Sequence, residues 1–431
     1  MADTTTVSPS AGPGTGLVLG LAALFVVVLG LFGPDWLRVP PEWLVCPVSD
    51  VGGDGLTWVA REAQIACMAV QDITRGMAAV VNAPIEAAVI ALSEGLFSGR
   101  GLNRAQSVPP LSWLAIVGAV AIVAFRLGGR RLCLAVSIGL GFLVVFGLWA
   151  QAMVTLASVL VSIVMTCALG LFIGIWSFRS DRVEAVVRGI MNVMQTLPIF
   201  AYLIPTLLLF GYGPAAALIA TVAYALPPMV HNTVLALKTV PNELVECGHV
   251  AGCTTRQLLW QVQLPASLAG IAVGLNQAIM MTLNMVIIAS MIGAGGLGFE
   301  VLTALRKLDI GVGLEAGMGI VALAVVLDRI SQAWARRAAE GGRRHPGQRP
   351  LCVLVPVWLV LATVVAFLWE PAQAWPKDWA ISTASFWNGL VSWMNRELYE
   401  SLEAFRAFVL LNIMRPFRDA LALMPWSVGA G

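Results

Sequence analysis

Charged residues are scarce in this sequence, where Asp, Glu, Lys and Arg make up 12% of the 431 residues. An ordinary soluble domain contains about a quarter of such residues. Hydrophobic residues reach 58%, and the formal net charge is only +2. This balance excludes a soluble globular protein and gives no basic face for binding nucleic acid. The composition predicts an all-α polytopic membrane protein.

Catalytic and metal-binding patterns are also missing. The three histidines, His231, His249 and His345, are not arranged for metal binding or catalysis, no Ser/His/Asp set falls on one element, and the seven cysteines lack metal-type spacing. Cys46 and Cys67 would fall in one outer segment and could pair, although the odd count argues against a disulfide framework. No G-x-x-x-x-G-K-S/T string for binding ATP phosphates occurs. We expect no enzyme activity, metal or cofactor in this chain.

Long apolar runs dominate the sequence. Nine of them approach the length that a bilayer requires: 16–33, 111–125, 132–150, 152–177, 191–211, 213–230, 266–291, 311–328 and 351–369. A further apolar stretch, 73–97, is interrupted by Asn82, Pro84 and Glu86. We interpret that stretch as an amphipathic element that lies at the interface or re-enters the membrane.

Basic residues cluster in every second loop between these runs, at 126–131, 179–188, 238–256 and 336–349. The positive-inside rule makes these loops cytoplasmic, and the N-terminus then lies inside as well. The first run is not preceded by a basic region, so we do not expect a cleaved signal peptide.

The central runs contain no Asp, Glu, Lys, Arg or His over 132–150, 152–177, 196–230 and 266–299. Proton relays and ion-coupled pathways normally need such groups at membrane depth. A proton-coupled carrier is therefore disfavoured, whereas a sodium-coupled carrier that binds its ion through backbone carbonyls stays open. Glu315 and Asp328 lie near the ends of the eighth run, where a structural or interfacial role is expected.

One polar stretch, ECGHVAGCTTRQLLWQVQLP at 246–265, separates two of the apolar runs. Its apolar positions predict a pair of short amphipathic helices, with Gly252 allowing a close turn and Pro265 opening the next span. Such a helix can lie in the groove of a partner protein. The alternative is an ordinary loop without a partner.

This stretch resembles the cytoplasmic loop of permease subunits of binding-protein-dependent ABC importers. Those loops carry Glu-Ala-Ala, three residues, Gly, nine residues, Ile, one residue and Leu-Pro. Four positions match this pattern: Glu246, Gly252, Leu264 and Pro265. Val262 replaces the Ile conservatively, and Cys247 and Gly248 stand where the two Ala are expected. From 195 to 305 the chain is similar to permeases that import glycine betaine, proline betaine, choline and related quaternary ammonium osmolytes.

The resemblance implies a type I ABC importer transmembrane domain with a core of five to six helices. Region 111–335 would be this core, with a coupling loop at 234–265. Region 1–110 would supply an N-terminal span and a periplasmic or interfacial part. Region 336–431 would supply a cytoplasmic linker, an extra span and, from a weak internal repeat, the start of a second permease module. Within it, 383–424 is expected to lie along the membrane as an amphipathic element.

The resemblance also implies the partners of this chain. They are an ATP-binding subunit that hydrolyses ATP, a periplasmic substrate-binding protein, a second permease copy and membrane lipid, without nucleic acid. The location would be the bacterial inner membrane. Tight recognition of the quaternary amine would belong to the binding protein.

Neutral polar and polarisable side chains gather in the run at 266–291. We name six as candidate pathway residues: Asn276, Gln277, Met280, Thr282, Asn284 and Ser290. Amides and hydroxyls would let a quaternary ammonium zwitterion pass, but polar residues in membranes also join helices by hydrogen bonds. Both interpretations stay open from the sequence.

A glycine-rich string follows this run. Its members are Gly293, Gly295, Gly296 and Gly298. Three of them have G-x-G-x-x-G spacing, but the dinucleotide-binding motif requires a preceding strand and a βαβ unit, which are absent. In the resembling permeases this string ends the helix after the coupling loop. We expect these glycines at the outer mouth of the pathway, where they allow close packing.

Overall fold

The computed structural model describes residues 53–55, 57–58, 64–65, 68–98, 105–108, 110–339, 351–373 and 375–422. The span expected at 16–33 and the possible Cys46–Cys67 pair lie outside them. The chain divides into two compact units, 56–389 and 1–55 with 390–431. Helices dominate the described residues of both units, as predicted. The described strands form two small antiparallel hairpins, β1 (Gln64–Ile65) with β2 (Met68–Ala69) and β3 (Leu96–Ser98) with β4 (Ala105–Val108).

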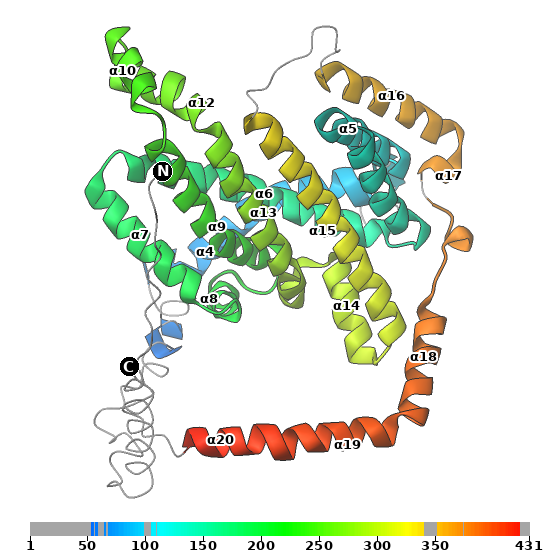
Figure 1. The fold of residues 1–431 in the computed structure, drawn as a ribbon. Coiled ribbons are helices and arrows are strands. Elements are labelled where there is room, and N and C mark those ends of the chain that lie inside the picture. Colours follow the sequence, from blue (N-terminus) through cyan, green and yellow to red (C-terminus); the bar gives the residue numbers. More distant parts are fainter. Residues whose placement is uncertain are drawn as a thin grey trace, which may run out of the picture. The chain divides into compact units, whose positions relative to one another are not determined.

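Figure 1 shows the helices of the 56–389 unit. In chain order they are α4 (Val70–Val89), η2 (Ile90–Glu94), α5 (Trp113–Val145), α6 (Trp149–Phe178), α7 (Asp181–Thr196), α8 (Phe200–Phe210), α9 (Pro214–Lys238), α10 (Asn242–Val250), α11 (Thr255–Gln257), η4 (Leu258–Gln263), α12 (Leu264–Ala266), α13 (Leu268–Ala289), η5 (Ser290–Ala294), α14 (Gly296–Lys307), α15 (Ile310–Ala339), α16 (Leu351–Leu368), α17 (Glu370–Gln373) and η6 (Lys377–Trp379).

Six helices in the described residues are long and apolar enough to cross a membrane, namely α4 with its continuation η2, α5, α6, α9, α13 and α15. The pair α7 and α8 would make a seventh span if counted together, and α16 is a shorter apolar helix. The predicted runs at 152–177, 213–230, 266–291 and 311–328 coincide with α6, α9, α13 and α15.

Three of these helices, α6, α9 and α13, form the centre of the unit. A Cβ at Gly170 of α6 would come within 2.4 Å of Met229 on α9, and one at Gly174 within 2.6 Å of Thr233. From the first contact to the second, both helices advance by four residues in the same direction along the chain, so α6 and α9 run parallel. Gly270 and Gly274 of α13 meet α9 in the opposite order, at Ala236 and Asn232. Small residues thus let the three backbones approach closely, as is common between membrane helices.

The bundle therefore has two distinguishable ends. We call them the loop end, where residues 239–267 join α9 to α13, and the opposite end, where α6 and α9 begin.

Helix α5 reverses its direction at Gly129, which has a non-helical φ of 71°. Near its start, Leu111 N–H donates to Ala91 O at 3.0 Å, and beyond its end Ser93 Oγ donates to Ala150 O at 3.3 Å. Residues 111 and 150 thus lie close together, although a straight helix of this length would separate them by about 50 Å. The two arms of α5 correspond to the runs predicted at 111–125 and 132–150.

The turn between these arms lies at the loop end, because Arg337 in the last turn of α15 donates to Arg126 O. Lys238 at the end of α9 bonds Glu184 in the first turn of α7 at the same end. Members of all four basic clusters therefore gather at one end of the bundle, as the predicted topology requires.

The run predicted as one span at 191–211 is sharply bent, and whether its two helices cross the membrane as a single span stays a prediction. Helices α7 and α8 meet at an angle of 106°. Leu197 takes an extended conformation with ψ 133°, because Pro198 disfavours helical geometry in the residue before it. A hydrophobicity pattern cannot register such a bend.

Helix α4 has both ends at the opposite end of the bundle. Thr74 Oγ1 donates to Leu209 O, just before the start of α9, and Ser93 Oγ donates to Ala150 O, at the start of α6. Ile85, between them, is buried against Leu218. We interpret α4 as lying against this end of the bundle, although its length and composition alone would allow a span. The interfacial or re-entrant position expected for 73–97 stays a prediction.

The segment after α16 is bound to the core of the same unit. Trp113 Nε1 donates to Pro371 O at 2.8 Å, and Ile381 N–H donates to Val145 O at 2.9 Å. The Trp375 ring makes an edge contact with Trp113, with 5.7 Å between centroids. The C-terminal part up to residue 389 is therefore integral to this unit.

A cluster of hydrogen bonds, which we call the clasp, joins residues 382–388 to the start of α15. The buried Glu315 carboxylate accepts from the Ser382 and Thr383 hydroxyls and from Thr383 N–H. Asn388 Nδ2 donates to Asp309 at 2.9 Å and its Oδ1 accepts from Gly311 N–H at 2.8 Å. The bond from Asn388 is the main reason that the pKa of Asp309 lies below its ordinary value. The structural role expected for Glu315 is therefore seen.

The other unit contains the rest of α18 (Ala384–Glu397), then α19 (Tyr399–Val409), η7 (Leu410–Met414) and α20 (Arg415–Ala422). Large apolar side chains such as Trp393, Phe405 and Phe417 are more than half exposed there. This agrees with the amphipathic character predicted for 383–424, and its position on a membrane stays a prediction.

Candidate functional site

The polar stretch between α9 and α13 folds as the predicted pair of short helices. Helix α10 forms the first, and α11, η4 and α12 form a continuous second one. Both stand at the loop end of the unit, where α10 and α12 are labelled in Figure 1. We call residues 242–266 the coupling segment. Its place at the tip of the bundle leaves it accessible to another protein.

The turn between these helices depends on Gly252. Its φ of +77° lies in the left-handed region, which glycine adopts without steric cost. Gly252 N–H donates to His249 O and Cys253 N–H donates to Gly248 O, both at 3.0 Å. These two bonds form a Schellman motif, which satisfies the last carbonyls of α10. The predicted role of Gly252 as the turn residue is therefore seen in the structure.

The second helix begins with a capping box. The Thr254 hydroxyl accepts from Gln257 N–H at 3.4 Å, and the Gln257 side chain accepts from Thr254 N–H at 2.9 Å. This reciprocal pair satisfies donors that a helix start leaves free. The stretch therefore fixes its own geometry at both the stop of one helix and the start of the next.

Gly248 allows the two helices to approach. A Cβ at this position would come within 2.5 Å of Leu258 Cδ1. Leu258 and Leu259 are each only 5% exposed and anchor η4 against α10. Gly248, which stands where an Ala is expected, therefore lets the two helices of the coupling segment pack closely. The neighbouring Cys247 is exposed.

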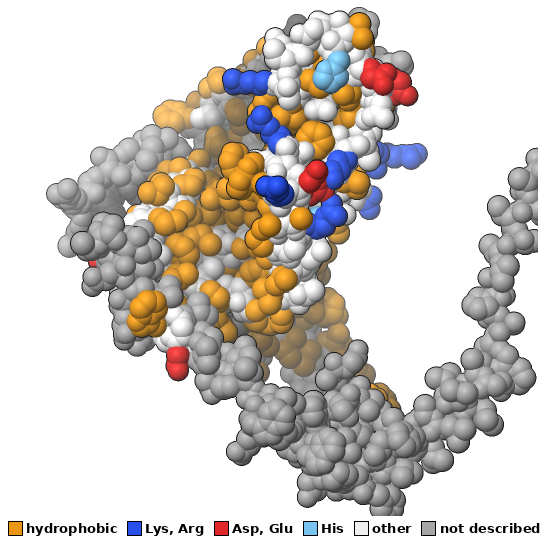
Figure 2. Space-filling model, turned by 90° about the vertical axis from the view of Figure 1, so that its left-hand side faces the viewer, with side chains coloured by type: hydrophobic (Ala, Val, Ile, Leu, Met, Phe, Trp, Pro, Cys, Tyr) orange, Lys and Arg blue, Asp and Glu red, His pale blue; other side chains and the backbone are white. Residues whose placement is uncertain are grey.

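The outer surface of the coupling segment mixes charge with apolar side chains. Glu246 is exposed, Val250 is 90% exposed and Trp260 is 53% exposed. Val262, Leu264 and Pro265 continue the segment into α13. Figure 2, which faces α7 and α10, shows acidic and histidine side chains at this tip, Lys and Arg below it, and then a broad hydrophobic surface. This order is typical of a membrane protein leaving the bilayer at its basic end.

An ion pair with a buried carboxylate and two half-exposed cations holds α7 beside the coupling segment. Glu184 is 6% exposed and accepts from Lys238 Nζ at 2.6 Å and from Arg188. Lys238 is the last residue of α9, four residues before α10. The carboxylate thus links the start of α7 to the helix that leads into the coupling segment.

The six candidate pathway residues fall into two groups. Gln277, Met280 and Asn284 are exposed, and their spacing of three and four residues places them on one face of α13. Gln277 Oε1 also accepts from Asn232 Nδ2 of α9 at 2.8 Å. This face of α13 is polar and open within a single copy of the chain.

The remaining three residues are bound inside the protein. Asn276 accepts from Ser331 of α15. Thr282 is fully buried and donates to Ala278 O within its own helix, at 2.8 Å. Ser290 is 1% exposed and donates to Gly295 O at 3.1 Å. Their contacts favour helix packing over a lining role.

The glycine string turns the chain from α13 into α14. Gly293, Gly295 and Gly296 all have positive φ, whereas Gly298 is an ordinary buried residue of α14. A Cβ on Gly296 would come within 2.3 Å of Thr155 Oγ1. That hydroxyl accepts from Leu297 N–H at 2.8 Å and so ties the turn to α6. The close packing expected of these glycines is present, and their place at the mouth of a pathway stays a prediction.

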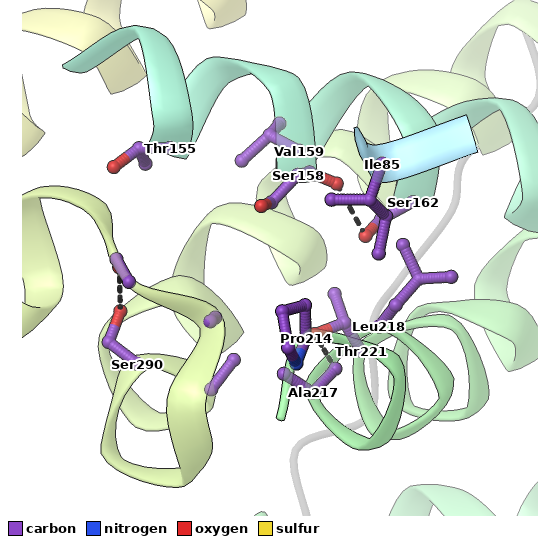
Figure 3. Close-up of a pocket in the computed structure, with 13 residues that line it drawn as sticks. Ile85, Thr155, Ser158, Val159, Ser162, Pro214, Ala217, Leu218, Thr221 and Ser290 are labelled. Carbon is purple, nitrogen blue, oxygen red and sulfur yellow. Dashed lines mark hydrogen bonds between the residues drawn. The ribbon is translucent and has the colours of Figure 1, made fainter. Parts of the chain in front are cut away.

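A small cavity of about 20 Å³ lies beside this turn, between α6, α9 and η5. Figure 3 shows Ser158, Ser162 and Thr221 around it, with Ile85 of α4 above. Ser162 and Thr221 donate to carbonyls of their own helices, at 2.8 Å and 2.7 Å. The space suffices for about one water molecule. The sequence analysis missed these hydroxyls, although Ser158 and Ser162 have helical spacing within an apolar run.

Residues 167–340 match the family described as binding-protein-dependent transport system inner membrane component. The glycine betaine transport system permease protein OpuAB of Bacillus subtilis is 38% identical to this chain, over 60% of this chain and 85% of that protein. Taken with the helical bundle and its coupling segment, these matches show that the chain belongs to this family of permease components.

Two further permease proteins are similar in sequence to this chain. The glycine betaine/proline betaine transport system permease protein ProW of Salmonella typhimurium is 42% identical, over 52% of this chain and 64% of that protein. The trimethylamine N-oxide transport system permease protein TmoV of Pelagibacter ubique is 35% identical, over 75% of this chain and 46% of that protein. The chain thus spans about half to two thirds of the length of these relatives.

Family membership confirms the resemblance and the fold class predicted from the coupling-loop pattern. The chain is a multi-pass inner-membrane component of a transport system. The alternative of a sodium-coupled carrier is not supported, because the family is that of binding-protein-dependent transport.

Proposed function

We propose that this chain is the translocation subunit of an ATP-driven importer for small, fully substituted amines. Its relatives are named for glycine betaine, proline betaine and trimethylamine N-oxide. In each of these compounds the nitrogen has four substituents and a formal positive charge. ATP hydrolysis takes place in a separate subunit, because no phosphate-binding string occurs in this sequence.

The coupling segment is the observation that carries this proposal. Its two helices are fixed by the Gly252 turn and lie at the tip of the bundle. Helix α10 offers Val250 and Glu246 on an open surface, which is the form of a helix that docks in a partner's groove. Closure of the ATP-binding subunits would move α10 and, through the start of α13, the transmembrane bundle.

The partners follow from the same assignment. The ATP-binding subunit docks at the loop end, which is cytoplasmic together with the N-terminus, and a periplasmic binding protein delivers substrate at the opposite end. Two copies of the chain pair, with the face of Gln277, Met280 and Asn284 directed to the pathway between them. Amides and a thioether offer the substrate weak contacts that allow passage.

Reconstitution tests this proposal. The chain, a cognate ATP-binding subunit and a binding protein are placed in proteoliposomes, and uptake of radiolabelled glycine betaine and trimethylamine N-oxide is measured with and without ATP. We expect uptake that requires ATP and all three proteins. Accumulation along a sodium gradient in the absence of the ATP-binding subunit would refute the proposal.

A further inference from the structure

A cleft of about 390 Å³ opens at the opposite end of the bundle, beside the small cavity of Figure 3. Asn82, Glu86 and Glu94 line it from α4 and η2, and Val154, Pro214 and Ala294 line it from the core. Its volume is in the range of pockets that bind small organic molecules. The cleft lies far from the coupling segment and is separate from the exposed face of α13.

The charge in this cleft is unusual for its surroundings. Glu86 and Glu94 are exposed carboxylates on α4 and η2, a mostly apolar stretch at the opposite end of the bundle. Lys and Arg are absent from the residues that line the cleft. The two carboxylates are eight residues apart, about two turns, so both lie on the side of the helix that faces the cleft. The cleft therefore favours a positively charged guest.

A second feature also indicates a ligand. Asn82 Oδ1 is buried and has no hydrogen-bond partner among the described residues. A buried acceptor without a partner costs about 1–3 kcal/mol. Asn82 stands one helical turn before Glu86, on the wall of the same cleft. An electropositive group placed there would interact with this oxygen.

The remaining wall selects the kind of cation. Apart from the Ser158 hydroxyl it is formed by aliphatic side chains, including Ile85, Val89 and Val154. A small hard ion is normally held by several carboxylates that converge on it, and the described residues contain no group of three or more His, Cys, Asp or Glu side chains that could hold a metal ion. A quaternary ammonium group instead has a diffuse charge on a surface of methyl groups, and aliphatic walls accommodate that surface.

We propose that this cleft binds the methylated ammonium group of the substrate where it enters the permease. The choice of ligand rests on the proposed function, but the charge and shape of the cleft do not. The carboxylates raise the local concentration of cationic guests at the entrance. A full cation such as choline binds more tightly than glycine betaine, because the carboxylate of betaine is repelled by Glu86.

Direct binding to the purified full chain tests this inference. The chain is placed in nanodiscs of phosphatidylethanolamine and phosphatidylglycerol, and choline binding is measured by calorimetry. We expect Glu86→Gln to weaken binding about five- to tenfold, as loss of one nearby opposite charge predicts. The neutral analogue 3,3-dimethylbutanol should bind at least about tenfold more weakly than choline.

Two further variants make the result specific. Glu300→Gln removes a carboxylate from α14 that does not line the cleft, and it should bind choline like the wild type. Val154→Phe fills the cleft without changing charge and should abolish binding. Equal affinity of the wild type and Glu86→Gln, or of choline and its neutral analogue, would overturn the inference.

The lipid composition of the nanodiscs shows whether the ammonium group in the cleft comes from a lipid headgroup or from a free solute. Nanodiscs that contain phosphatidylcholine should compete with free choline if a lipid headgroup can enter the cleft, and should leave its affinity unchanged if only the free solute fits. Transport separates this inference from the proposed function. If uptake is driven by ATP but choline binding does not depend on Glu86, only the inference about the cleft is refuted. If choline binding depends on Glu86 but no uptake occurs, only the proposed function is refuted.

Discussion

Gly296→Ala should strongly destabilise the junction of α13 and α14. Gly296 has φ +73°, and a Cβ there would lie 2.3 Å from Thr155 Oγ1 and 3.0 Å from Thr155 N. The left-handed conformation costs a residue with a side chain about 1–2 kcal/mol. Forcing an extra methyl group into packed surroundings costs about 1–3 kcal/mol. Together they predict a loss of about 2–5 kcal/mol in the free energy of unfolding.

Two other glycines separate these effects. Gly252 has a similar φ of +77° but no atom within 4 Å of an added Cβ, so Gly252→Ala should cost only the conformational part, about 1–2 kcal/mol. Gly317 is helical and also has open space around it. Gly317→Ala should be neutral or stabilise the protein by up to about 1 kcal/mol, because alanine favours a helix.

The assay is the apparent melting temperature of each variant in detergent, followed by size-exclusion chromatography after heating. We expect the order Gly317→Ala at or above the wild type, then Gly252→Ala, then Gly296→Ala. A Gly296→Ala protein that melts at or above Gly252→Ala would refute the argument, because the contact with Thr155 would then carry no cost.

Three further predictions concern the other parts of the site. Glu246→Lys should abolish copurification of the ATP-binding subunit and leave membrane insertion normal, and intact copurification would contradict the docking role. Gln277→Leu and Asn284→Leu should lower uptake severalfold without changing the melting temperature. Asn276→Leu should instead lower the free energy of unfolding by about 1 kcal/mol, because it breaks an interhelical hydrogen bond. Normal uptake in the first two variants and unchanged stability in the third would contradict the division into two groups. Glu315→Gln should increase proteolysis between 375 and 388, because an amide replaces one acceptor oxygen of the clasp with a donor, and unchanged protection would show that the clasp is not needed there.

The coupling segment was the part most open to prediction from the sequence. Gly252, Thr254 and Gln257 act within a few residues of one another, so their turn and capping geometry is encoded locally. The arms of α5 were also predictable, because the basic residues at 126–131 interrupt one long apolar stretch. The clasp could not be predicted, because Glu315 and Thr383 are 68 residues apart and hydrophobic periodicity contains no information on which distant residues pair.

The candidate pathway shows the same limit. Residues Asn276 and Gln277 are adjacent and both are amides, so composition cannot separate them. The structure does so because adjacent residues on a helix point about 100° apart. Asn276 turns to Ser331, while Gln277 stays on the open face. The bend at Leu197 and Pro198 was missed because a change of direction leaves the hydrophobicity of 191–211 unaltered.

The clasp has a mechanical consequence. Helix α15 is held near its start by Glu315 and close to its other end by the bond from Arg337 to Arg126. The hairpin α5, which packs along it, is joined to the same C-terminal segment through Val145. These parts therefore form a stiff frame that a moving helix can push against. In the proposed importer, a movement that starts at α10 would reach α9 and α13 first, so α5 and α15 would stay fixed while α7, α9 and α13 move.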